Sequence, residues 1–440
     1  MGTAVCPRRR RKCGGGVVPR GGPRAPLPGS RQCHSGWRWA HRPGGPWDSP
    51  REEFRIMTPP RALESNGSIP LVSLWPLLSG PPSGMGAYFR GLQGDGRYVR
   101  FKELIYRSRR GVAAPAVLRR LEHQFLAPIR NGRILDDIAD RPWVLGGQQF
   151  VSHFSRRRLE TATVVVFDLI DILCPESNLT SGQVRTTWKA MENVRSAQTV
   201  VTISEYSRER IIGLYDIDPD RVSVIPFGVD AVRFRPGSGD QKAACREAFG
   251  LPKSSLVVLY VGSEQRRKNL PTLIAGLAQY RKKDGDLVFV KAGESQSDLG
   301  RSRFSSALRA NQMEQATMLL QELSEGQMAD LYRAADILAF PSVEEGWGIP
   351  VLEAMASGVP VLSSRIPPVV EFAGDTVLYV DDPFSPGDWS SGLAELRTND
   401  SLRATLSTAG RRRALDLTWD RARGRFAART QLGAVSVGQT

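Results

Sequence analysis

The sequence predicts an α/β protein built from two Rossmann-like domains, whose parallel sheets face each other across an inter-domain cleft. Short β-branched and aliphatic runs alternate with helical segments in two separate series. A polar, Gly-containing stretch at 231–250 divides the two series and suggests a linker. Strands that alternate with helices of this length form parallel sheets covered by helices on both faces. The 440 residues suffice for two or three domains with cores of their own.

The first series begins with the apolar run IPLVSLW at 69–75, which indicates a buried strand. A Gly-rich loop over 76–92 follows it, and a helix is expected to begin near Ala87. Between 93 and 160 the pattern is poorest. The other elements predicted in this half are strands at 162–173, 197–204 and 220–230 and a helix at 205–217.

The second series begins with the continuous apolar strand SLVVLYVG at 255–262. Residues 400–432 have a helical, Arg-rich pattern and predict a terminal pair of helices. The elements predicted between them are strands at 286–293, 316–323, 336–342, 358–364 and 376–381 and helices at 270–283, 324–335 and 349–358. These patterns divide the chain into a leader (1–65), two Rossmann-like domains (66–232 and 233–415) and a C-terminal helical tail (416–440).

The leader is rich in Pro, Gly and Arg and cannot bury enough apolar surface to offset the entropy of ordering. We expect it to be disordered, or to be an upstream extension with Met57 as the true start. Residues 1–56 carry 12 Lys/Arg and 3 acidic residues, so most of the net charge of +15 lies there. A nucleic-acid-binding arm is the alternative. The rest of the chain is only mildly basic, which suits anionic substrates or a lipid surface and does not require nucleic acid.

The five cysteines include no Cys-x-x-Cys pair, which indicates free thiols in a reducing compartment such as the cytoplasm. The histidines near Cys33 fit no common zinc frame, so no metal site is predicted. No run reaches the roughly 18 apolar residues of a membrane span. We therefore expect any membrane contact to be peripheral, through the basic stretch 96–111, at the inner face of the cytoplasmic membrane.

Two segments that follow predicted strands suit the binding of phosphate. In the loop at 76–92, Gly84 and Gly86 allow backbone N–H groups to approach a phosphate closely, although a tight turn also explains them. In YVGSEQRRKNLPTL (260–273), Arg266, Arg267 and Lys268 precede a helix and oppose its dipole. A diphosphate beside them would compensate this charge, and an exposed basic turn is the alternative.

Two other segments carry carboxylates at the ends of strands. Glu345 lies in the loop VEEGWG, and Glu353 lies on the short helix after it. Carboxylates accept hydrogen bonds from sugar hydroxyls, so one suits a donor sugar and the other a ribose; helix capping is the alternative. Asp168 and Asp171 follow the strand at 162–173 and either face the same cleft or cap a loop.

Together these segments resemble family 4 of the retaining glycosyltransferases with the GT-B fold, also described as glycosyl transferases group 1. The likeness covers about 69–420. The most specific match is the Glu-x7-Glu signature from Glu345 to Glu353 within EGWGIPVLEAMASGVPVL. The segments that are similar to family counterparts in order and spacing are YVGSEQRRKNLPTLI, LLQELSEGQMADLYRAADILAFPS, VTISEYSRERII, VIPFGVD and SGPPSGMGAYFRGL.

The resemblance implies that the first domain binds the acceptor and that the second holds a nucleotide sugar. Arg267 and Lys268 would neutralise the donor diphosphate without a metal ion or cofactor. The other assignments that it implies are binding of the donor sugar and phosphate by catalytic Glu345 and the amides of Gly346, Trp347 and Gly348, ribose binding by Glu353, base binding by Leu323, and a phosphate contact from Gly86.

Two departures from the family pattern are present. Ser263 stands where relatives often have an Arg, so the charge would shift to Arg266, Arg267 and Lys268. Phe167-Asp168 stands where many relatives have His-Asp, and Asp168 is the substitute catalytic candidate.

The predicted function is retaining hexosyl transfer from a nucleotide-diphosphate sugar to a glycan, a lipid-linked or a small-molecule acceptor, as in polysaccharide biosynthesis. A non-catalytic nucleotide-sugar-binding subunit is one alternative, prompted by Phe167. A nucleotide-sugar epimerase of similar fold is another, but the four histidines lie outside the recognised motifs.

Overall fold

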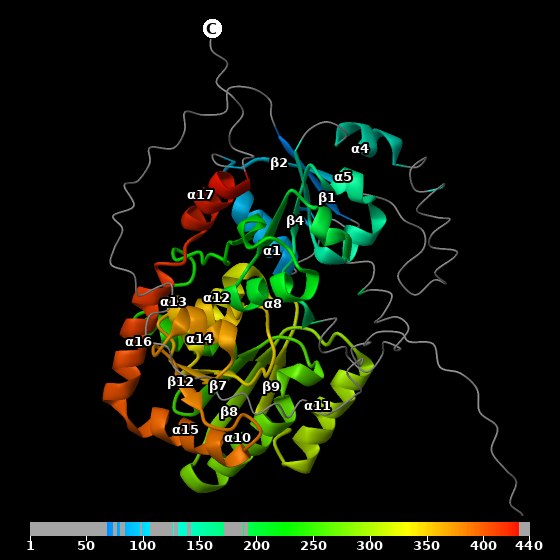
Figure 1. Ribbon diagram of the computed structural model, residues 1–440. Helices are drawn as coiled ribbons and strands as arrows, with labels where there is room; N and C mark the ends of the chain where they lie inside the picture. Colours follow the sequence, from blue (N-terminus) through cyan, green and yellow to red (C-terminus); the bar gives the residue numbers. More distant parts are fainter. Residues whose placement is uncertain are drawn as a thin grey trace, which may run out of the picture. The chain divides into compact units, whose positions relative to one another are not determined.

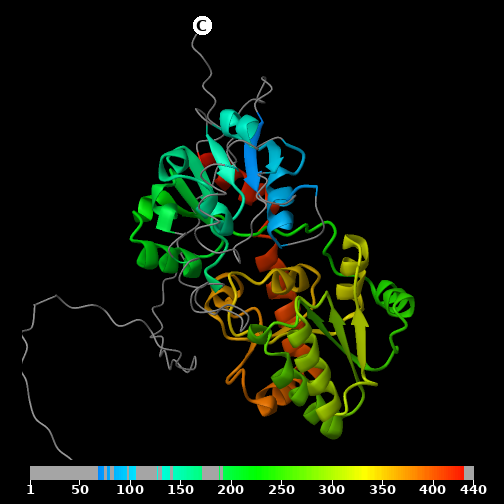
Figure 2. The same ribbon diagram turned by 90° about the vertical axis from the view of Figure 1, so that its right-hand side faces the viewer.

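The computed structural model describes residues 68–73, 77–79, 84–96, 99–105, 126, 131–138, 142–170, 188 and 192–430. The predicted leader, Asp171, and parts of the Gly-rich loop and of the basic stretch 96–111 lie outside these residues. The described chain forms two sheets of six parallel strands each, with helices packed against them (Figures 1 and 2).

The first sheet has the strand order β2-β1-β3-β4-β5-β6. Four of its strands lie within predicted ones but are shorter: β1 (Ile69–Ser73), β4 (Ala162–Val165), β5 (Thr199–Thr202) and β6 (Val222–Val224). The other two, β2 (Phe101–Ile105) and β3 (Trp143–Leu145), come from the region with the poorest pattern. The helices of this half are α1 (Gly84–Gln93), α4 (Gly132–Asp137), η2 (Gln148–His153), α5 (Arg156–Leu159), η3 (Glu192–Ser196), α8 (Glu205–Tyr215) and η4 (Pro219–Arg221).

The second sheet has the strand order β12-β11-β10-β7-β8-β9. All of its strands were predicted: β7 (Leu256–Val261), β8 (Leu287–Ala292), β9 (Thr317–Leu320), β10 (Ile337–Phe340), β11 (Val361–Ser364) and β12 (Leu378–Val380). Its helices are α9 (Gly239–Ala248), η5 (Arg266–Lys268), α10 (Leu270–Asp284), α11 (Asp298–Ala310), α12 (Glu325–Ala334), α13 (Ile349–Ala356), α14 (Pro367–Ala373), α15 (Pro386–Thr398) and α16 (Asp400–Ala414). Among the described helices, none has both the length and the apolar character needed to cross a bilayer.

The interpretation of 231–250 as a linker is wrong for its second half, because α9 forms there. Ser238 and Gln241 cap this helix reciprocally at its N-terminus. Near its other end, buried Arg246 donates to the Ala334 carbonyl oxygen at 3.0 Å and pairs with Asp336 at 2.5 Å. The helix is therefore held by polar contacts, which an apolar periodicity does not reveal.

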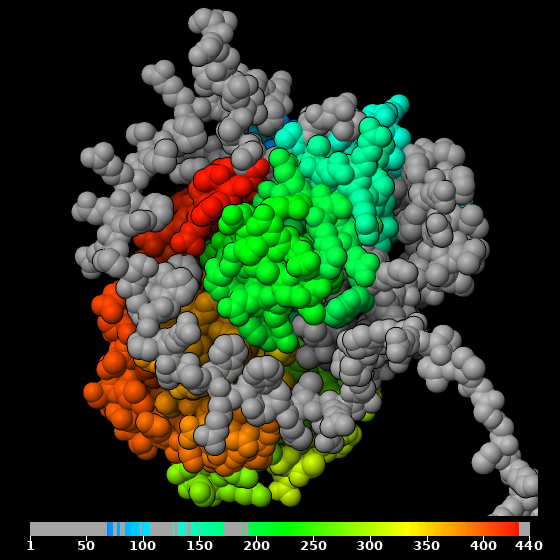
Figure 3. Space-filling model, in the orientation of Figure 1, coloured from blue at the N-terminus to red at the C-terminus, as the bar shows by residue number. Residues whose placement is uncertain are grey.

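The last helix, α17 (Trp419–Thr430), lies against α1 at the side of the first sheet (Figure 1). Arg423 Nε donates to the Gly91 carbonyl oxygen at 2.8 Å, and the Phe426 ring meets the Phe101 ring edge-on, with centroids 6.0 Å apart. Just before the helix, Val229 N donates to the Leu417 carbonyl oxygen at 2.8 Å. In the space-filling view of Figure 3, red atoms at the C-terminal end of the described chain border atoms coloured green. The two helices predicted at 400–432 thus have different neighbours, since α16 is joined to α13 by the bond from Arg411 Nη1 to Ala356 O.

Replacing Gly91 by Ala is expected to lower the free energy of unfolding by about 1–3 kcal/mol. A Cβ at this position would lie 2.4 Å from the Trp419 ring, so α1 and α17 would have to move apart. Gly213→Ala in α8 is the control, because a Cβ there meets no atom within 4 Å. It should stabilise the chain by up to about 1 kcal/mol through helix propensity. Denaturant unfolding measures both variants, and equal effects would contradict the packing of α17 on α1.

Candidate functional site

The candidate site lies where two neighbouring strands of the second sheet end. Strands β7 and β10 pair in parallel, so the loops that follow them leave the same edge of the sheet. The first loop leads into η5, which holds Arg267 and Lys268, and the second leads to Glu345 and then α13. Val343 N donates to the Arg267 carbonyl oxygen at 2.9 Å, which joins the two loops directly.

Glu345 lies between the two cations. Its Oε2 accepts from Arg267 Nη1 at 2.6 Å, and its Oε1 lies 2.5 Å from Lys268 Nζ. Arg267 Nη1 also donates to the Glu344 carbonyl oxygen at 3.0 Å. The side chains are 11% exposed for Glu345, 19% for Arg267 and 12% for Lys268, so the cluster is shielded from water. We call these three residues the clamp.

Burial and ion pairing shift the pKa values of the clamp residues in opposite directions. Burial favours a neutral Glu345, but Lys268 and Arg267 outweigh it and lower the pKa of this carboxyl. Burial lowers the pKa of Lys268, and Glu345 offsets only part of that change. For Arg267 the attraction of Glu345 exceeds the effect of burial, so its pKa is raised. Glu345 is therefore ionised at neutral pH and partly neutralises the two cations.

Asp168 from the first half of the chain lies against Gly346. A Cβ on Gly346 would be 2.7 Å from the Asp168 Cβ and 3.0 Å from its Oδ2, so the glycine permits this approach. Asp168 Oδ1 accepts from Ile170 N at 3.0 Å, and Gln148 Nε2 donates to the Asp168 carbonyl oxygen at 2.9 Å. The carboxylate is thereby fixed beside the loop that carries Glu345.

Phe167 points into the core of the first half rather than toward the clamp. Its side chain is 6% exposed, and its ring lies edge-on against Tyr88 with centroids 5.2 Å apart. Phe89 and Phe227 complete the aromatic cluster. Because of this packing, Phe167 offers no polar group to the site, whereas the neighbouring Asp168 is ionisable.

Glu353 has a different environment from Glu345. It is half-buried on α13, and its Oε2 accepts from Tyr332 Oη of α12 at 2.8 Å. Burial raises the pKa of Glu353 to about 7, and the Tyr332 hydrogen bond offsets only part of that rise. Glu353 thus changes its charge near neutral pH, which Glu345 does not.

The other predicted site residues are placed as follows. The Trp347 side chain is 3% exposed and stacks on Phe372 with centroids 4.6 Å apart, so its ring is part of the core. Gly348 is the N-cap of α13. Gly86 lies in the first turn of α1, which begins three residues before the predicted start, and Leu323 follows β9, partly buried. Their assigned ligand contacts stay predictions.

A polar contact beside the clamp was not expected from the sequence. Glu344 Oε1 accepts from Tyr206 Oη at 2.8 Å and from Arg210 Nη1 at 2.7 Å, both on α8. At the N-terminus of α8, Glu371 accepts from the backbone N–H groups of Glu205 and Tyr206 at 2.9 and 3.3 Å. Burial raises the pKa of Glu371 to about 7. The pair Glu344-Glu345 in the loop was the available signal, since only one of the two had been given a role.

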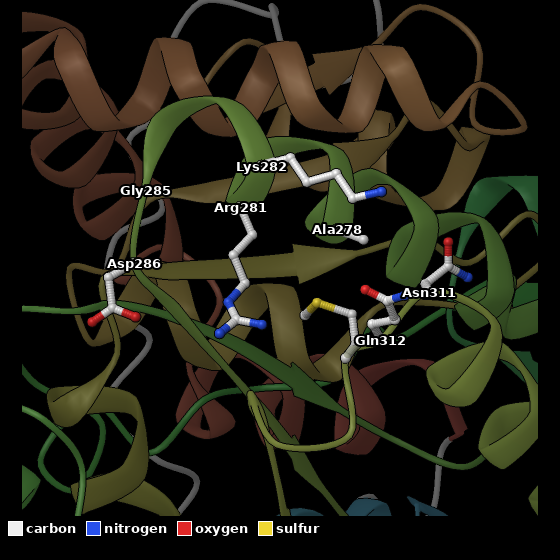
Figure 4. Close-up of a pocket in the computed structure, with 8 residues that line it drawn as sticks. Ala278, Arg281, Lys282, Gly285, Asp286, Asn311 and Gln312 are labelled. Atoms are coloured by element: carbon white, nitrogen blue, oxygen red, sulfur yellow. The ribbon is translucent and has the colours of Figure 1, made fainter.

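A pocket of about 340 Å³ is lined by residues that precede β8 and β9, at the opposite edge of the sheet from the clamp (Figure 4). Arg281 and Lys282 at the end of α10 and Asn311 and Gln312 after α11 surround it. Since ligands of open parallel sheets bind beyond the carboxyl ends of the strands, this pocket is not the candidate site.

Replacing Glu353 by Gln is expected to raise the free energy of unfolding at pH 8 by about 3 kcal/mol and to leave it unchanged at pH 4. The pKa of Glu353 is about 7 in the folded chain and ordinarily 4.5, so stability is lost as the pH rises from about 4.5 through about 7. At about 1.4 kcal/mol per pKa unit, this difference corresponds to about 3 kcal/mol. Denaturant titrations at the two pH values measure it.

The control for this substitution is Glu395→Gln, on the exposed face of α15. It should change stability by no more than about 0.5 kcal/mol at either pH. If both variants gained the same stability at pH 8, the environment of Glu353 would not be the cause.

Known proteins resemble this chain in sequence. Residues 241–413 match the family described as glycosyl transferases group 1. The chain is 35% identical over 238 residues to a D-inositol 3-phosphate glycosyltransferase of Salinispora arenicola (strain CNS-205). This match covers 52% of this chain and 53% of that protein. A protein with the same name from Saccharomonospora viridis is 32% identical over 242 residues, and the match covers 52% of this chain and 54% of that protein. The chain thus spans about half the length of these relatives.

Solved structures resemble it in fold. Anabaena HepE in complex with UDP and glucose superposes with a TM-score of 0.65 at 16% identity, covering 84% of this chain and 100% of that one. Sucrose-phosphate synthase from Thermosynechococcus elongatus gives a TM-score of 0.68 at 19% identity, with the same coverage. The chain therefore has the GT-B fold expected from its sequence, and residues 241–413 match group 1 of the glycosyl transferases.

Proposed function

We propose that this protein is a retaining glycosyltransferase that transfers a hexose from a nucleotide-diphosphate sugar to an acceptor, with no metal ion or cofactor. The observation that carries the proposal is the clamp beside Gly346 and Asp168, at the strand ends where this fold binds ligands. The match of 241–413 to group 1 glycosyl transferases supports it.

The clamp suits the charges that develop in this reaction. When the bond between sugar and diphosphate breaks, negative charge grows on the leaving phosphate and positive charge grows on the sugar. Arg267 and Lys268 are fixed in place and can stabilise the phosphate without reorganising. Glu345 and Asp168 are the carboxylates that can face the sugar. A bound diphosphate would share the two cations with Glu345.

The relatives and the structural neighbours guide the choice of substrates. Two relatives are named for D-inositol 3-phosphate, so we propose a phosphorylated polyol as the first acceptor to test. The complexes of HepE with UDP support a uridine nucleotide as donor. Glycan and lipid-linked acceptors stay alternatives. We expect the reaction to take place in the cytoplasm, including the inner face of its membrane.

A non-catalytic subunit that binds nucleotide sugars is the second candidate. The burial of Phe167 favours it, because the position where many relatives have a histidine supplies no proton-accepting group. Tight donor binding without transfer to any acceptor would support this candidate.

The test is to incubate the full chain with UDP-glucose, UDP-N-acetylglucosamine or GDP-mannose and with inositol 3-phosphate, and to detect the product by mass spectrometry. Lys268→Met is expected to lower kcat/KM at least about 100-fold, because the leaving diphosphate loses a fixed charge. Lys283→Met removes an exposed lysine of α10 and should leave kcat/KM within about twofold. Transfer by Lys268→Met at the wild-type rate would refute the proposed role of the clamp.

A further inference from the structure

A second group of charges lies at the same sheet edge as the clamp. Glu264 follows β7, Lys291 lies near the end of β8, and Arg301 lies in the first turns of α11. Glu264 Oε1 is 3.1 Å from Lys291 Nζ and 3.0 Å from Arg301 Nη2. The side chains of Glu264 and Lys291 are each 1% exposed, so this pair is fully buried.

The group contains two cations but only one carboxylate. A single cation neutralises a buried carboxylate, and Lys291 does so for Glu264. Arg301 is therefore surplus, and its side chain is 31% exposed. Arg267 and Lys268 are less exposed and already share the carboxylate of Glu345. Among these paired cations, Arg301 is the one most open to an anion from solvent.

The position of Arg301 on its helix also calls for a negative partner. It is the fourth residue of α11, where a cation opposes the positive end of the helix dipole. The N-terminus of α11 is held against the loop after β7, since a Cβ on Gly300 would lie 2.7 Å from the Glu264 carbonyl oxygen. Four residues after Glu264, the same loop reaches Lys268.

The loop after β7 has no charged side chain at position 263. Ser263 directly follows Gly262 in the loop after β7, and its side chain is neutral. Ser263 is tied to the sheet through its carbonyl oxygen, which accepts from Tyr260 Oη at 2.6 Å. Its short side chain carries no charge toward the site, whereas Arg301 approaches the same loop from α11 and is oriented by Glu264.

We propose that Arg301 is a further phosphate-binding residue of the donor site, held in position by the buried pair Glu264–Lys291. The proposal rests on the proposed function, because it assigns Arg301 to the diphosphate of the same nucleotide sugar. The guanidinium forms an ion pair with Glu264 through Nη2 and can offer its other N–H groups to a phosphate oxygen.

The experiment compares UDP with uridine as ligands of the full chain by isothermal titration calorimetry. Arg301→Gln is expected to weaken the binding of UDP about tenfold and to leave the binding of uridine unchanged, because only UDP carries phosphates. The buried pair Glu264–Lys291 stays intact in this variant, and thermal unfolding verifies that it is folded.

Arg309→Gln is the matched control, since it removes the same charge from the exposed end of the same helix. It should leave the UDP affinity unchanged. An equal loss in both variants would mean that overall charge, not a contact, attracts UDP, and would overturn the proposal. So would an unchanged UDP affinity in Arg301→Gln.

Arg301→Lys covers the case in which Arg301→Gln does not fold, because it keeps a charge that can pair with Glu264. It should weaken UDP binding about threefold, and an unchanged affinity would overturn the proposal. If the wild-type chain bound neither UDP nor GDP, the proposed function would fail instead, so the two failures are distinguishable.

Discussion

The buried ion pairs from Glu345 to Arg267 and Lys268 are the interactions on which the rest of the site depends. Charges with little access to water remain stable only if they are paired and well oriented, and here both cations pair with the one carboxylate. Each partner is therefore fixed by the others, and the loops after β7 and β10 are fixed with them. A catalytic group that is held in this way needs little reorganisation when charge develops nearby.

This arrangement also connects the two halves of the chain. The loop of Glu345 continues into Gly346, which lies against Asp168 from the end of β4. The neighbouring Glu344 binds Tyr206 and Arg210 on α8, and Glu371 receives the first N–H groups of that helix. The cation-binding loop thus contacts the first half on two sides, through a backbone approach and through a carboxylate.

The sequence predicted the second half of the fold well because its strands are continuous apolar runs with clear helical periods between them. It also predicted that Arg267, Lys268 and Glu345 belong to one site, since they follow parallel strands. It missed β2 and β3, whose short segments alternate too weakly, and α9, which a capping box and Arg246 hold in place. Helices α11, α14 and α15 of the second half were not predicted either.

The sequence could not show how the predicted residues pair. That Glu345 faces the cations, while Glu353 faces Tyr332, depends on side-chain geometry that spacing alone does not contain. The inward orientation of Phe167 depends on Tyr88, about 80 residues away along the chain. The group of Glu264, Lys291 and Arg301 joins three elements. Glu264 lies in the segment YVGSEQRRKNLPTLI but had been given no role, and Lys291 and Arg301 lie outside the recognised motifs.

The contact between α17 and α1 has a consequence for how the protein is made. The first half of the chain leaves the ribosome early, yet one side of α1 stays uncovered until the final helix has been synthesised. The aromatic surface around Phe101 is thus exposed throughout translation of the second half. A premature stop codon before Trp419 would leave this surface permanently open.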